Sequence, residues 1–541
     1  MAEYPGDGLP DWRARYDAVR ALGVPLDPRS EEVPGVTAYP TSYAPDHLLI
    51  TRADDLDELF GVLEEAATQF AWRIELQNID GSPLEIPDAV AREARNREAF
   101  DVPTIHRVKI TSVPNRDGAA TPDPPVDAWR LLQRARMLRG KDLRGVALDH
   151  VLTAGPFGVS NPFGVSNPFG VSNPFGVSNP FGVSNPFGVS NAPGTISYAV
   201  PGSGGRQVVN FVGRAPERHR EPAEGGRRPV IAVLDTGCGI HPWLPPEVVT
   251  TYPEYDGKVI GMADHATDPE VTGDIAGPLD GALDPAAGHG TFVSGVVRQR
   301  APEADIISVR VCDSQGQMLE AEFMLAVRAL VKWMCEAGEH IDVMNLSLGY
   351  YHETPEDELY DDALESLLVA ARRHGCAVVC SAGNDATNRP SFPAALWMWG
   401  GSALTVADPD DAAPHVSVGA LNPNRTMALF SNLGTWVKTF APGAGVLSCS
   451  PPFRGGSQPA VRDDLGGARR ETIDPDDYAG GFALWSGTSF AAPYVAGEIL
   501  AHIAPRIMGG TLSLEERIDL LHEAESEVSA RLAKTGPLTA R

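Results

Sequence analysis

Two residues in Gly-rich surroundings have the types and settings needed for acid–base chemistry. Asp235 follows the apolar run Val230–Leu234, and His289 lies between two glycines just before the run FVSGVV. An acid at the carboxyl end of a parallel strand lies where such sheets bind ligands. Histidine titrates near neutral pH and suits a general base. The pair could therefore supply a base and an orienting acid, although a buried capping acid and a structural histidine would give the same patterns.

Ser489 and Asn384 could complete such a site. Ser489 precedes the small-residue run FAAP at the head of a predicted helix, where helix N–H groups can face a developing anion. Asn384 follows the predicted strand Ala377–Ser381, and an amide there can donate to an oxyanion, a contact worth about 3 kcal/mol in a transition state. Singly, they could be an N-cap and a turn residue. All four residues together, at predicted sheet edges, indicate nucleophilic catalysis.

The segments around these residues predict an α/β fold with a mostly parallel central sheet. Apolar runs alternate with helical patterns after residue 229, which is typical of parallel sheets. The expected strands are Val230–Leu234, Asp305–Val311, Ile341–Leu346 and Ala377–Ser381. The expected helices are Glu320–Ala337, Glu356–His374 and Leu514–Leu532.

The segments that carry the four residues resemble the subtilisin-like serine peptidases, the subtilases. The matching segments are VLDTGCGIHPWL, GHGTFVSGVV, NLSLGY, SAGND, FSNLG, APG and SGTSFAAPYVAG, within Pro229–Pro505. The resemblance implies a three-layer sandwich and a serine endopeptidase that works through an acyl-enzyme. It implies Ser489 as nucleophile, His289 as general base, Asp235 as orienting acid and Asn384 as oxyanion donor.

The resemblance also implies where a peptide substrate would bind. The segment NLSLGY matches the family's edge strand, which pairs with extended substrate through main-chain hydrogen bonds. The loop Asp313–Gln317 is expected to form the other wall of the cleft. The substrate-binding residues implied are Ser347, Leu348, Gly349 and Gly383.

No metal or other cofactor is expected. Family members often bind calcium with an acidic residue after the HP pair, where this chain has Trp243. The calcium-binding loop after the histidine helix is also missing. Oxygen ligands could still gather among Asp264, Asp268, Glu270 and Asp274, but a solvated acidic loop is the commoner structure.

The part of the chain before the resemblance is expected to hold one small domain. Residues 1–45 form a loose leader, and residues 46–150 form an α+β domain. Many subtilases carry an N-terminal prodomain that assists folding and plugs the cleft, so the resemblance suggests that this domain is a prodomain or another regulatory or folding domain. A partner-recognition domain tethered by the repeats is the alternative. Its expected strands are His47–Thr51 and His106–Val113, and its expected helices are Asp54–Phe70 and Val126–Met137.

Residues 151–228 are predicted to be a low-complexity linker. Six identical PFGVSN units at 156–191 place a proline every sixth residue, which excludes a helix or central strand. Alternatives to a disordered linker are a hexapeptide β-solenoid and an NPF docking motif. The Arg-containing connector 201–228 is expected to be exposed and open to processing. A peptidase domain over 229–510 and a C-terminal helix and tail over 511–541 follow.

The amino-acid composition limits the classes of molecule that the chain could bind. The 541 residues include 44 Lys plus Arg and 71 Asp plus Glu, and the net charge of -27 argues against a nucleic-acid partner. No signal-peptide pattern or apolar run of membrane-spanning length is present. The six cysteines lack zinc spacing and are expected to be reduced. We therefore expect a cytoplasmic monomer that acts on peptides or proteins, without a membrane partner.

A catalytically silent scaffold with the same fold is the alternative function. Such a protein would use the cleft and the repeats for binding alone. A drifting pseudoenzyme would be expected to lose at least one catalytic position, whereas all four are filled here. The sequence therefore favours the peptidase.

Overall fold

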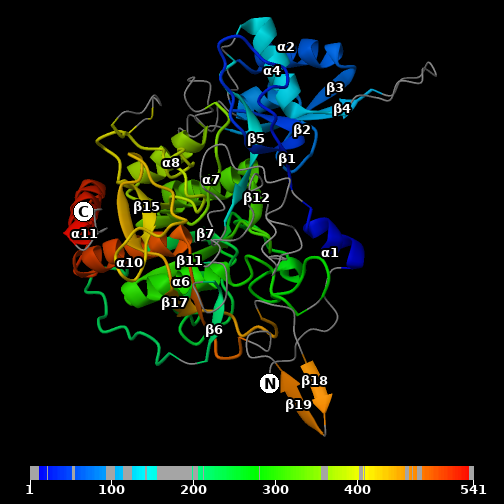
Figure 1. The fold of residues 1–541 in the computed structure, drawn as a ribbon. Coiled ribbons are helices and arrows are strands. Elements are labelled where there is room, and N and C mark those ends of the chain that lie inside the picture. The colour runs from blue at the N-terminus through cyan, green and yellow to red at the C-terminus, as the bar shows by residue number, and fades with distance from the viewer. Residues whose placement is uncertain are drawn as a thin grey trace.

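The computed structural model contains a small N-terminal unit and a larger unit built on a parallel sheet (Figure 1). The PFGVSN repeats lie outside the residues that the structure describes. The described residues are 11–20, 22–51, 55–92, 104–113, 125–140, 143–154, 198, 205–210, 212–279, 281–354, 363–400, 406, 408–456, 462–465, 467–471 and 478–534.

A parallel sheet of seven strands forms the centre of the larger unit. Its strand order is β16-β15-β14-β13-β7-β11-β8. All neighbouring strands in this sheet pair in parallel, which confirms the predicted fold class. The strands are β7 (Val230–Asp235), β8 (Val249–Thr251), β11 (Asp305–Arg310), β13 (Val343–Leu346), β14 (Ala377–Ser381), β15 (His415–Leu421) and β16 (Thr439–Pro442).

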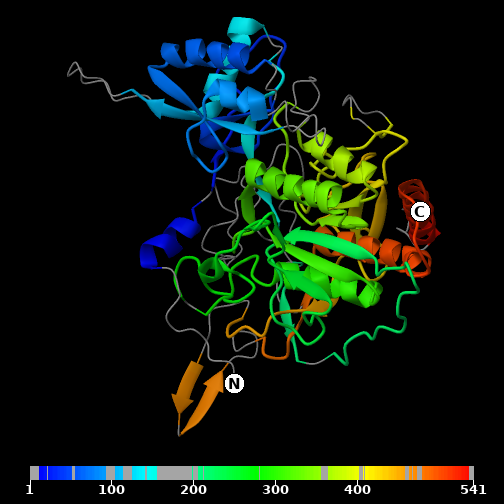
Figure 2. The same ribbon diagram turned by 180° about the vertical axis from the view of Figure 1, so that it is seen from behind.

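Helices cover both faces of this sheet (Figure 2). Successive residues of β7 alternate between two cores: Ile231 and Val233 pack in one, and Ala232 and Leu234 pack in the other. A strand buried on both faces needs such a continuous apolar run. The first core contains α6 (His289–Arg300), α10 (Thr488–Ile507) and α11 (Leu514–Lys534), and the second contains α7 (Glu320–Ala337) and α8 (Ala363–Arg373). The predicted three-layer sandwich is therefore confirmed.

The N-terminal unit is a β-α-β-β-α-β arrangement with an antiparallel sheet of order β5-β2-β4-β3. Its helices and strands share one core, which includes Leu48, Leu63, Trp129 and Leu148. The elements are β2 (Ser42–Ile50), α2 (Leu56–Gln69), β3 (Trp72–Gln77), β4 (His106–Ser112), α4 (Ala128–Arg139) and β5 (Val146–Thr153). In the leader, α1 (Trp12–Ala18) precedes β1 (Val24–Pro25), which pairs with β2.

Strand β5 joins the two units. One edge of β5 pairs with β2. Its other edge pairs antiparallel with β12 (Gln317–Leu319) of the larger unit. In Figure 1, β5 runs from the N-terminal unit towards the larger unit beside β12. The sequence placed 151–153 in a linker, but these residues belong to this strand.

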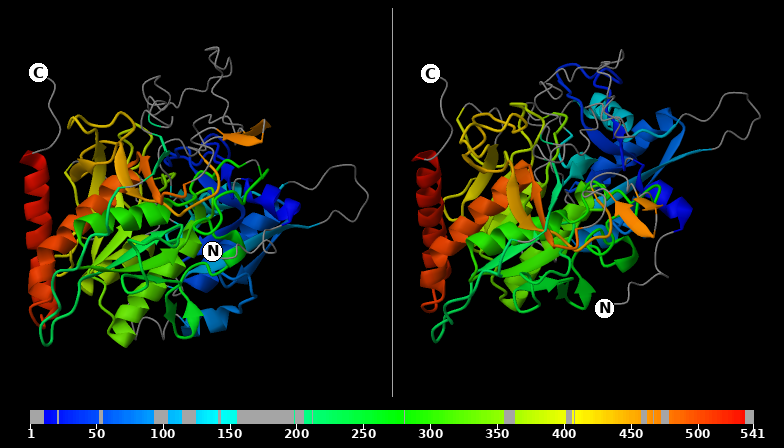
Figure 3. Two further views of the ribbon diagram at one scale, coloured as in Figure 1. Left: turned by 90° about the horizontal axis from the view of Figure 1, so that it is seen from below. Right: turned by 60° about the horizontal axis from the view of Figure 1, so that its bottom comes forward.

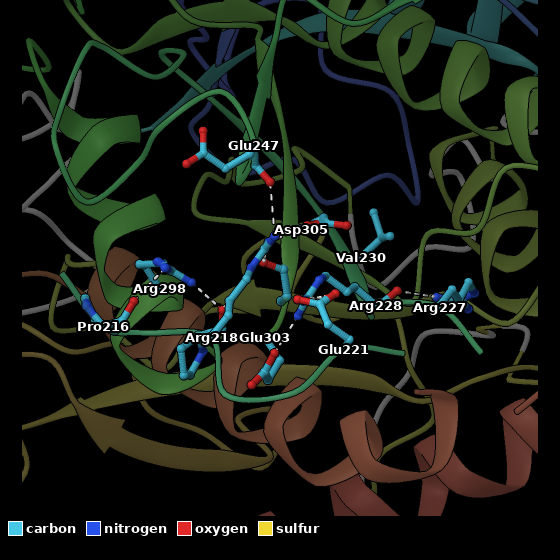
Figure 4. A network of polar contacts seen from close by, with 12 residues as sticks. Pro216, Arg218, Glu221, Arg227, Arg228, Val230, Glu247, Arg298, Glu303 and Asp305 are labelled. Atoms are coloured by element: carbon cyan, nitrogen blue, oxygen red, sulfur yellow. Dashed lines mark hydrogen bonds and ion pairs between the residues drawn. The ribbon is translucent and has the colours of Figure 1, made fainter. Parts of the chain in front are cut away.

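The connector that we expected to be exposed is so at 219–221 and 223–225, but three of its arginines bind the larger unit (Figure 4). Arg218 donates to the backbone oxygens of Glu247 and Ala304, and Arg228 pairs with Glu303. Arg227 donates twice to Asp342, with both N···O distances 2.6 Å. The expectation of a loose processing site is therefore wrong for these arginines, since their guanidinium groups have fixed partners.

Replacing Arg227 by alanine should destabilise the larger unit by about 3 kcal/mol, because the buried Asp342 carboxylate would lose its counter-ion. Urea unfolding of the full chain measures the loss. Arg373→Ala removes an exposed pair with Asp411 and should change stability by less than about 1 kcal/mol. Equal effects of the two changes would contradict the anchoring role of Arg227.

Small sheets complete the larger unit, and one hairpin projects from it at the bottom of Figure 1, which places it towards the viewer in Figure 3. The three-stranded sheet contains β17 (Val446–Cys449), β20 (Phe482–Trp485) and β6 (Gln207–Val209) of the connector. The hairpins are β9 (Glu254–Tyr255) with β10 (Lys258–Val259) and the projecting β18 (Arg462–Leu465) with β19 (Ala468–Glu471). None of the helices in the described part of the chain has the length and apolar content needed to span a membrane.

Candidate active site

Asp235 and His289 form a hydrogen-bonded pair at the carboxyl end of β7. Asp235 Oδ1 accepts from His289 Nδ1 at 2.6 Å and from the Thr236 N–H at 2.8 Å, and both side chains are fully buried. Because Nδ1–H donates to the carboxylate, a neutral ring carries its lone pair on Nε2. That nitrogen has no hydrogen-bond partner among the described residues. An unpaired buried nitrogen is uncommon and suits an atom that accepts a proton during a reaction.

Glycine at position 290 allows this close approach. His289 is the first residue of α6, and a Cβ at Gly290 would lie 2.0 Å from the Gly237 backbone oxygen. Gly237 itself has a φ of +112°, a conformation that favours glycine. The glycines of the two motifs thus let the start of α6 pack directly against the turn after β7.

Ser489 lies in the first turn of α10, and its neighbour Phe490 packs near the histidine. The ring of the next residue, Phe490, has its centroid 5.3 Å from that of His289. Ser489 Oγ donates to the Ser347 backbone oxygen at 3.4 Å, and Ser347 Oγ donates to the Ser489 backbone oxygen at 2.8 Å. Ser347 is fully buried. Its side chain therefore holds the backbone of the serine, and only its backbone could pair with a substrate.

Asn384 is oriented by Thr488. Its Oδ1 accepts from the Thr488 N–H and from Thr488 Oγ1, each at 2.9 Å. Since a backbone N–H can only donate, the amide oxygen must face Thr488 and the NH2 group points the other way. The Gly383 N–H also donates to Thr488 Oγ1, at 3.1 Å. Thr488 thus ties the SAGND turn to the helix that carries Ser489.

Strand β5 occupies the edge at which a substrate was expected to pair. The Thr153 N–H donates to the Gly349 oxygen and the Gly349 N–H donates to the Thr153 oxygen, both at 3.0 Å. On the other side, the Ala154 N–H donates to the Gly316 oxygen at 2.7 Å. Leu348, next to Gly349, is buried in the core that also holds Leu152. Residues 151–154 therefore lie as an extended peptide between two walls, and we call this segment the plug.

The acidic loop is partly buried and its carboxylates have protein donors. Asp268 and Glu270 are only 4% and 2% exposed, so the solvated loop expected from sequence is wrong for these two. The metal-ligand groups found among the described residues lie elsewhere: His150, His352 and Glu353 in the interior, and a surface group of His502, Glu523 and Glu527. In the interior group, the two ring nitrogens of His150 are hydrogen-bonded to Glu320 and Glu353. The atoms of His150 that could bind a metal are therefore already used in an ion pair.

The comparisons with known proteins agree with this architecture. The family model described as the subtilase family matches residues 226–508, more than half of the chain. The chain belongs to the subtilase family. The N-terminal unit lies outside the matched residues.

Three bacterial serine proteases of this family are similar to the chain. The intracellular serine protease of Paenibacillus polymyxa is 26% identical over 312 residues, which cover 54% of this chain and 73% of that protein. Serine protease AprX of Bacillus subtilis (strain 168) is 28% identical over 50% of this chain and 56% of its own. The thermophilic serine proteinase of Bacillus sp. (strain AK1) is 27% identical over 49% of this chain and 50% of its own. The last two relatives are thus matched over about half their length.

A solved structure of a cold-adapted subtilisin-like serine proteinase also matches. It is 22% identical and covers 59% of this chain and 88% of its own, with a TM-score of 0.33.

Sequence reasoning missed three parts of the site. Thr488 and Thr236 lie inside the quoted motifs, but their hydroxyl contacts depend on the fold. Glu270 was considered only as an acid of a loop, although it contacts Thr236 and Gly290. The plug carries no motif, and its pairing partner Gly349 is 196 positions from Thr153.

Proposed function

We propose that the chain is a serine endopeptidase with Ser489, His289, Asp235 and Asn384 as its catalytic residues. The observation that carries the proposal is the buried hydrogen bond between Asp235 and His289 Nδ1, which leaves Nε2 without a partner beside the helix of Ser489. Membership of the subtilase family and the protease names of its relatives support it.

The proposed reaction follows from these positions. Ser489 Oγ attacks the peptide carbonyl carbon, while His289 Nε2 takes its proton and later gives it to the leaving amine. Asp235 stabilises the imidazolium. The Asn384 NH2 group, together with the Ser489 N–H, donates to the carbonyl oxygen as it becomes negative. An acyl-enzyme forms with release of the amine, and water then hydrolyses it.

We further propose that the N-terminal unit regulates the site by filling the cleft. The plug pairs with Gly316 and Gly349 through main-chain hydrogen bonds, the way an extended substrate would pair. Substrates would then be peptides or proteins that enter in the same extended form. The peptidase unit would begin before residue 229, because Arg206 donates to the backbone of Leu283 and Ala287.

An intracellular setting and a monomeric state remain part of the proposal. The name of the Paenibacillus polymyxa relative and the six free cysteines support the setting.

Exchange of Asn384 for alanine tests the proposed site. It should lower kcat by about 100- to 1000-fold with little change in KM, because the amide acts on the oxyanion rather than on the bound substrate. The kinetics are measured in a chain that also carries Ala154→Pro, which removes the plug's N–H bond to Gly316 and which we call the opened chain. Asn78→Ala, in the N-terminal unit, is the control. An unchanged kcat would remove Asn384 from the site, and an inert opened chain would contradict the peptidase.

A further inference from the structure

A second buried carboxyl group lies next to the segments that carry the proposed catalytic pair. Glu270 follows η2 (His265–Thr267) in the acidic loop, and only 2% of its surface is exposed. The proposed mechanism does not use it. A buried carboxyl needs donors to offset its desolvation, so its partners indicate what the position is for.

The partners of Glu270 are the immediate neighbours of both catalytic residues. Its Oε1 accepts from Thr236 Oγ1 at 2.5 Å and from the Gly290 N–H at 3.0 Å. Its Oε2 accepts from Thr291 Oγ1 at 2.5 Å. Thr236 follows Asp235, and Gly290 and Thr291 follow His289. One carboxyl group thus fastens the turn after β7 to the first turn of α6.

The hydroxyl of Thr236 also connects Glu270 to the acid itself. Thr236 Oγ1 lies 3.2 Å from Asp235 Oδ1 and 2.5 Å from Glu270 Oε1, and it accepts from the Gly290 N–H at 2.8 Å. Since a hydroxyl has one proton, Thr236 can donate to only one of the two carboxylates at a time. The charge on Glu270 therefore bears on how Asp235 is hydrogen-bonded.

Two simpler roles for Glu270 account for fewer of its contacts. An acid that only capped α6 would bond the backbone N–H at the helix start and would not reach across to Thr236. A cation ligand would direct its oxygens at an ion, whereas these oxygens accept from two hydroxyls and one N–H. Glu270 also belongs to neither metal-ligand group found in the described part of the chain.

We infer that Glu270 is a positioning residue for the Asp235–His289 pair, acting through Thr236 and Gly290 and placing a titratable carboxyl one hydroxyl away from Asp235. This inference rests on the proposed peptidase function. Ionised Glu270 would stabilise the imidazolium that forms when His289 takes the proton of Ser489.

The surroundings allow this charge to change in the working pH range. Burial raises the pKa of Glu270 to about 8, and the neighbouring Asp268 and Asp235 add to the rise, while hydrogen bonds from Thr236 and Thr291 oppose it. Asp268 binds the Tyr252 hydroxyl, and Arg310 of β11 lies beside Gly237. Burial and Glu270 together raise the pKa of the nearby Cys238 to about 12, so this thiol stays neutral. Glu270 is thus the neighbour that gains a negative charge as the pH rises through about 8.

The pH profile of kcat/KM in the opened chain separates this role from a structural one. With Glu270 present, activity should rise in a second step near pH 8, as the new charge favours the imidazolium. Glu270→Gln should lack this step, so that its deficit grows to about tenfold by pH 9, the equivalent of one pKa unit of interaction. Asp284→Asn is the matched control, because Asp284 is also buried but accepts from the backbone of Ile275 and Ala276.

Glu270→Gln with the parent's profile, or with a deficit that is the same at every pH, would overturn the inference. Thr236→Val and Thr236→Ser provide a second pair should the glutamine variant not fold. The step near pH 8 should survive in the serine variant and be lost in the valine variant, and equal profiles for the two would overturn the inference. An opened parent chain that hydrolyses nothing would instead contradict the proposed function.

Discussion

Alanine at position 489 should abolish peptide hydrolysis by the opened chain, with a loss of about a millionfold in kcat, the size known for removal of a subtilisin nucleophile. The reason is that the acyl-enzyme route begins with Ser489 Oγ, and neither His289 nor Asn384 can replace that atom. An internally quenched peptide measures turnover, and far-UV circular dichroism checks the fold. Hydrolysis by the variant within tenfold of its parent would contradict Ser489 as nucleophile.

Raising the pH should weaken the hold of the plug by about tenfold per pH unit between 6.5 and 10, through His150. His150 lies on β5 next to the plug, is fully buried, and its two ring nitrogens contact Glu320 at 2.6 Å and Glu353 at 2.7 Å. Both glutamates belong to the larger unit. Only an imidazolium can donate to both carboxylates at once, so the docked state prefers the protonated ring.

The direction of this effect follows from the pKa values. Burial alone would lower the pKa of His150, but Glu320 and Glu353 outweigh burial and raise it to about 10. A raised pKa of His150 stabilises the docked state fully at pH values below the pKa of the undocked histidine, near 6.5. This stabilisation is lost as the pH rises through 10. His352, whose ring centroid lies 5.0 Å from that of His150, has a pKa lowered to about 3, and the pKa of His106 in the same sheet is lowered to about 4, so neither gains or loses a proton in this range.

His150→Gln in the otherwise unaltered, uncleaved chain provides the test. The ratio of its kcat/KM to that of the parent cancels the pH effects on the reaction that the two chains share. This ratio should be large at pH 6.5 and fall by about tenfold per pH unit up to about pH 10, because undocking of the parent then releases the proton of His150. His47→Gln is the control, since His47 is buried but bonds to Asp46 and Asp149 within the N-terminal unit. A ratio for His150→Gln that does not vary with pH would show that the ion pair of His150 does not hold the plug in the cleft.

The sequence predicted the parts of the larger unit that local patterns encode. The continuous apolar runs of β7 and β14 can be recognised in the sequence, because a strand buried on both faces does not alternate between polar and apolar residues. The turns and helix starts that carry Asp235, His289 and Ser489 were predictable because glycine and small residues mark them. The glycine at 290 illustrates the link, since any side chain there would collide with the backbone at 237.

The remaining features depend on partners that are distant in the chain. Residues 151–154 read as linker because their pairing with Gly316 and Gly349 becomes visible only once the two units dock. Arg227 and Arg228 read as an exposed basic segment, and their acidic partners, the buried Asp342 and the half-buried Glu303, come close to them only through the fold. Glu270 was read as solvated for the same reason.

A fluorophosphonate probe, followed by peptide mapping, tests the central claim most directly. The claim is that Ser489 is an activated nucleophile whose access is controlled by the plug. In the opened chain, the probe should form an adduct on Ser489, and Ser489→Ala should stay unlabelled. The uncleaved parent should react more slowly than the opened chain at the same pH. A folded opened chain with no adduct on Ser489 would contradict the account.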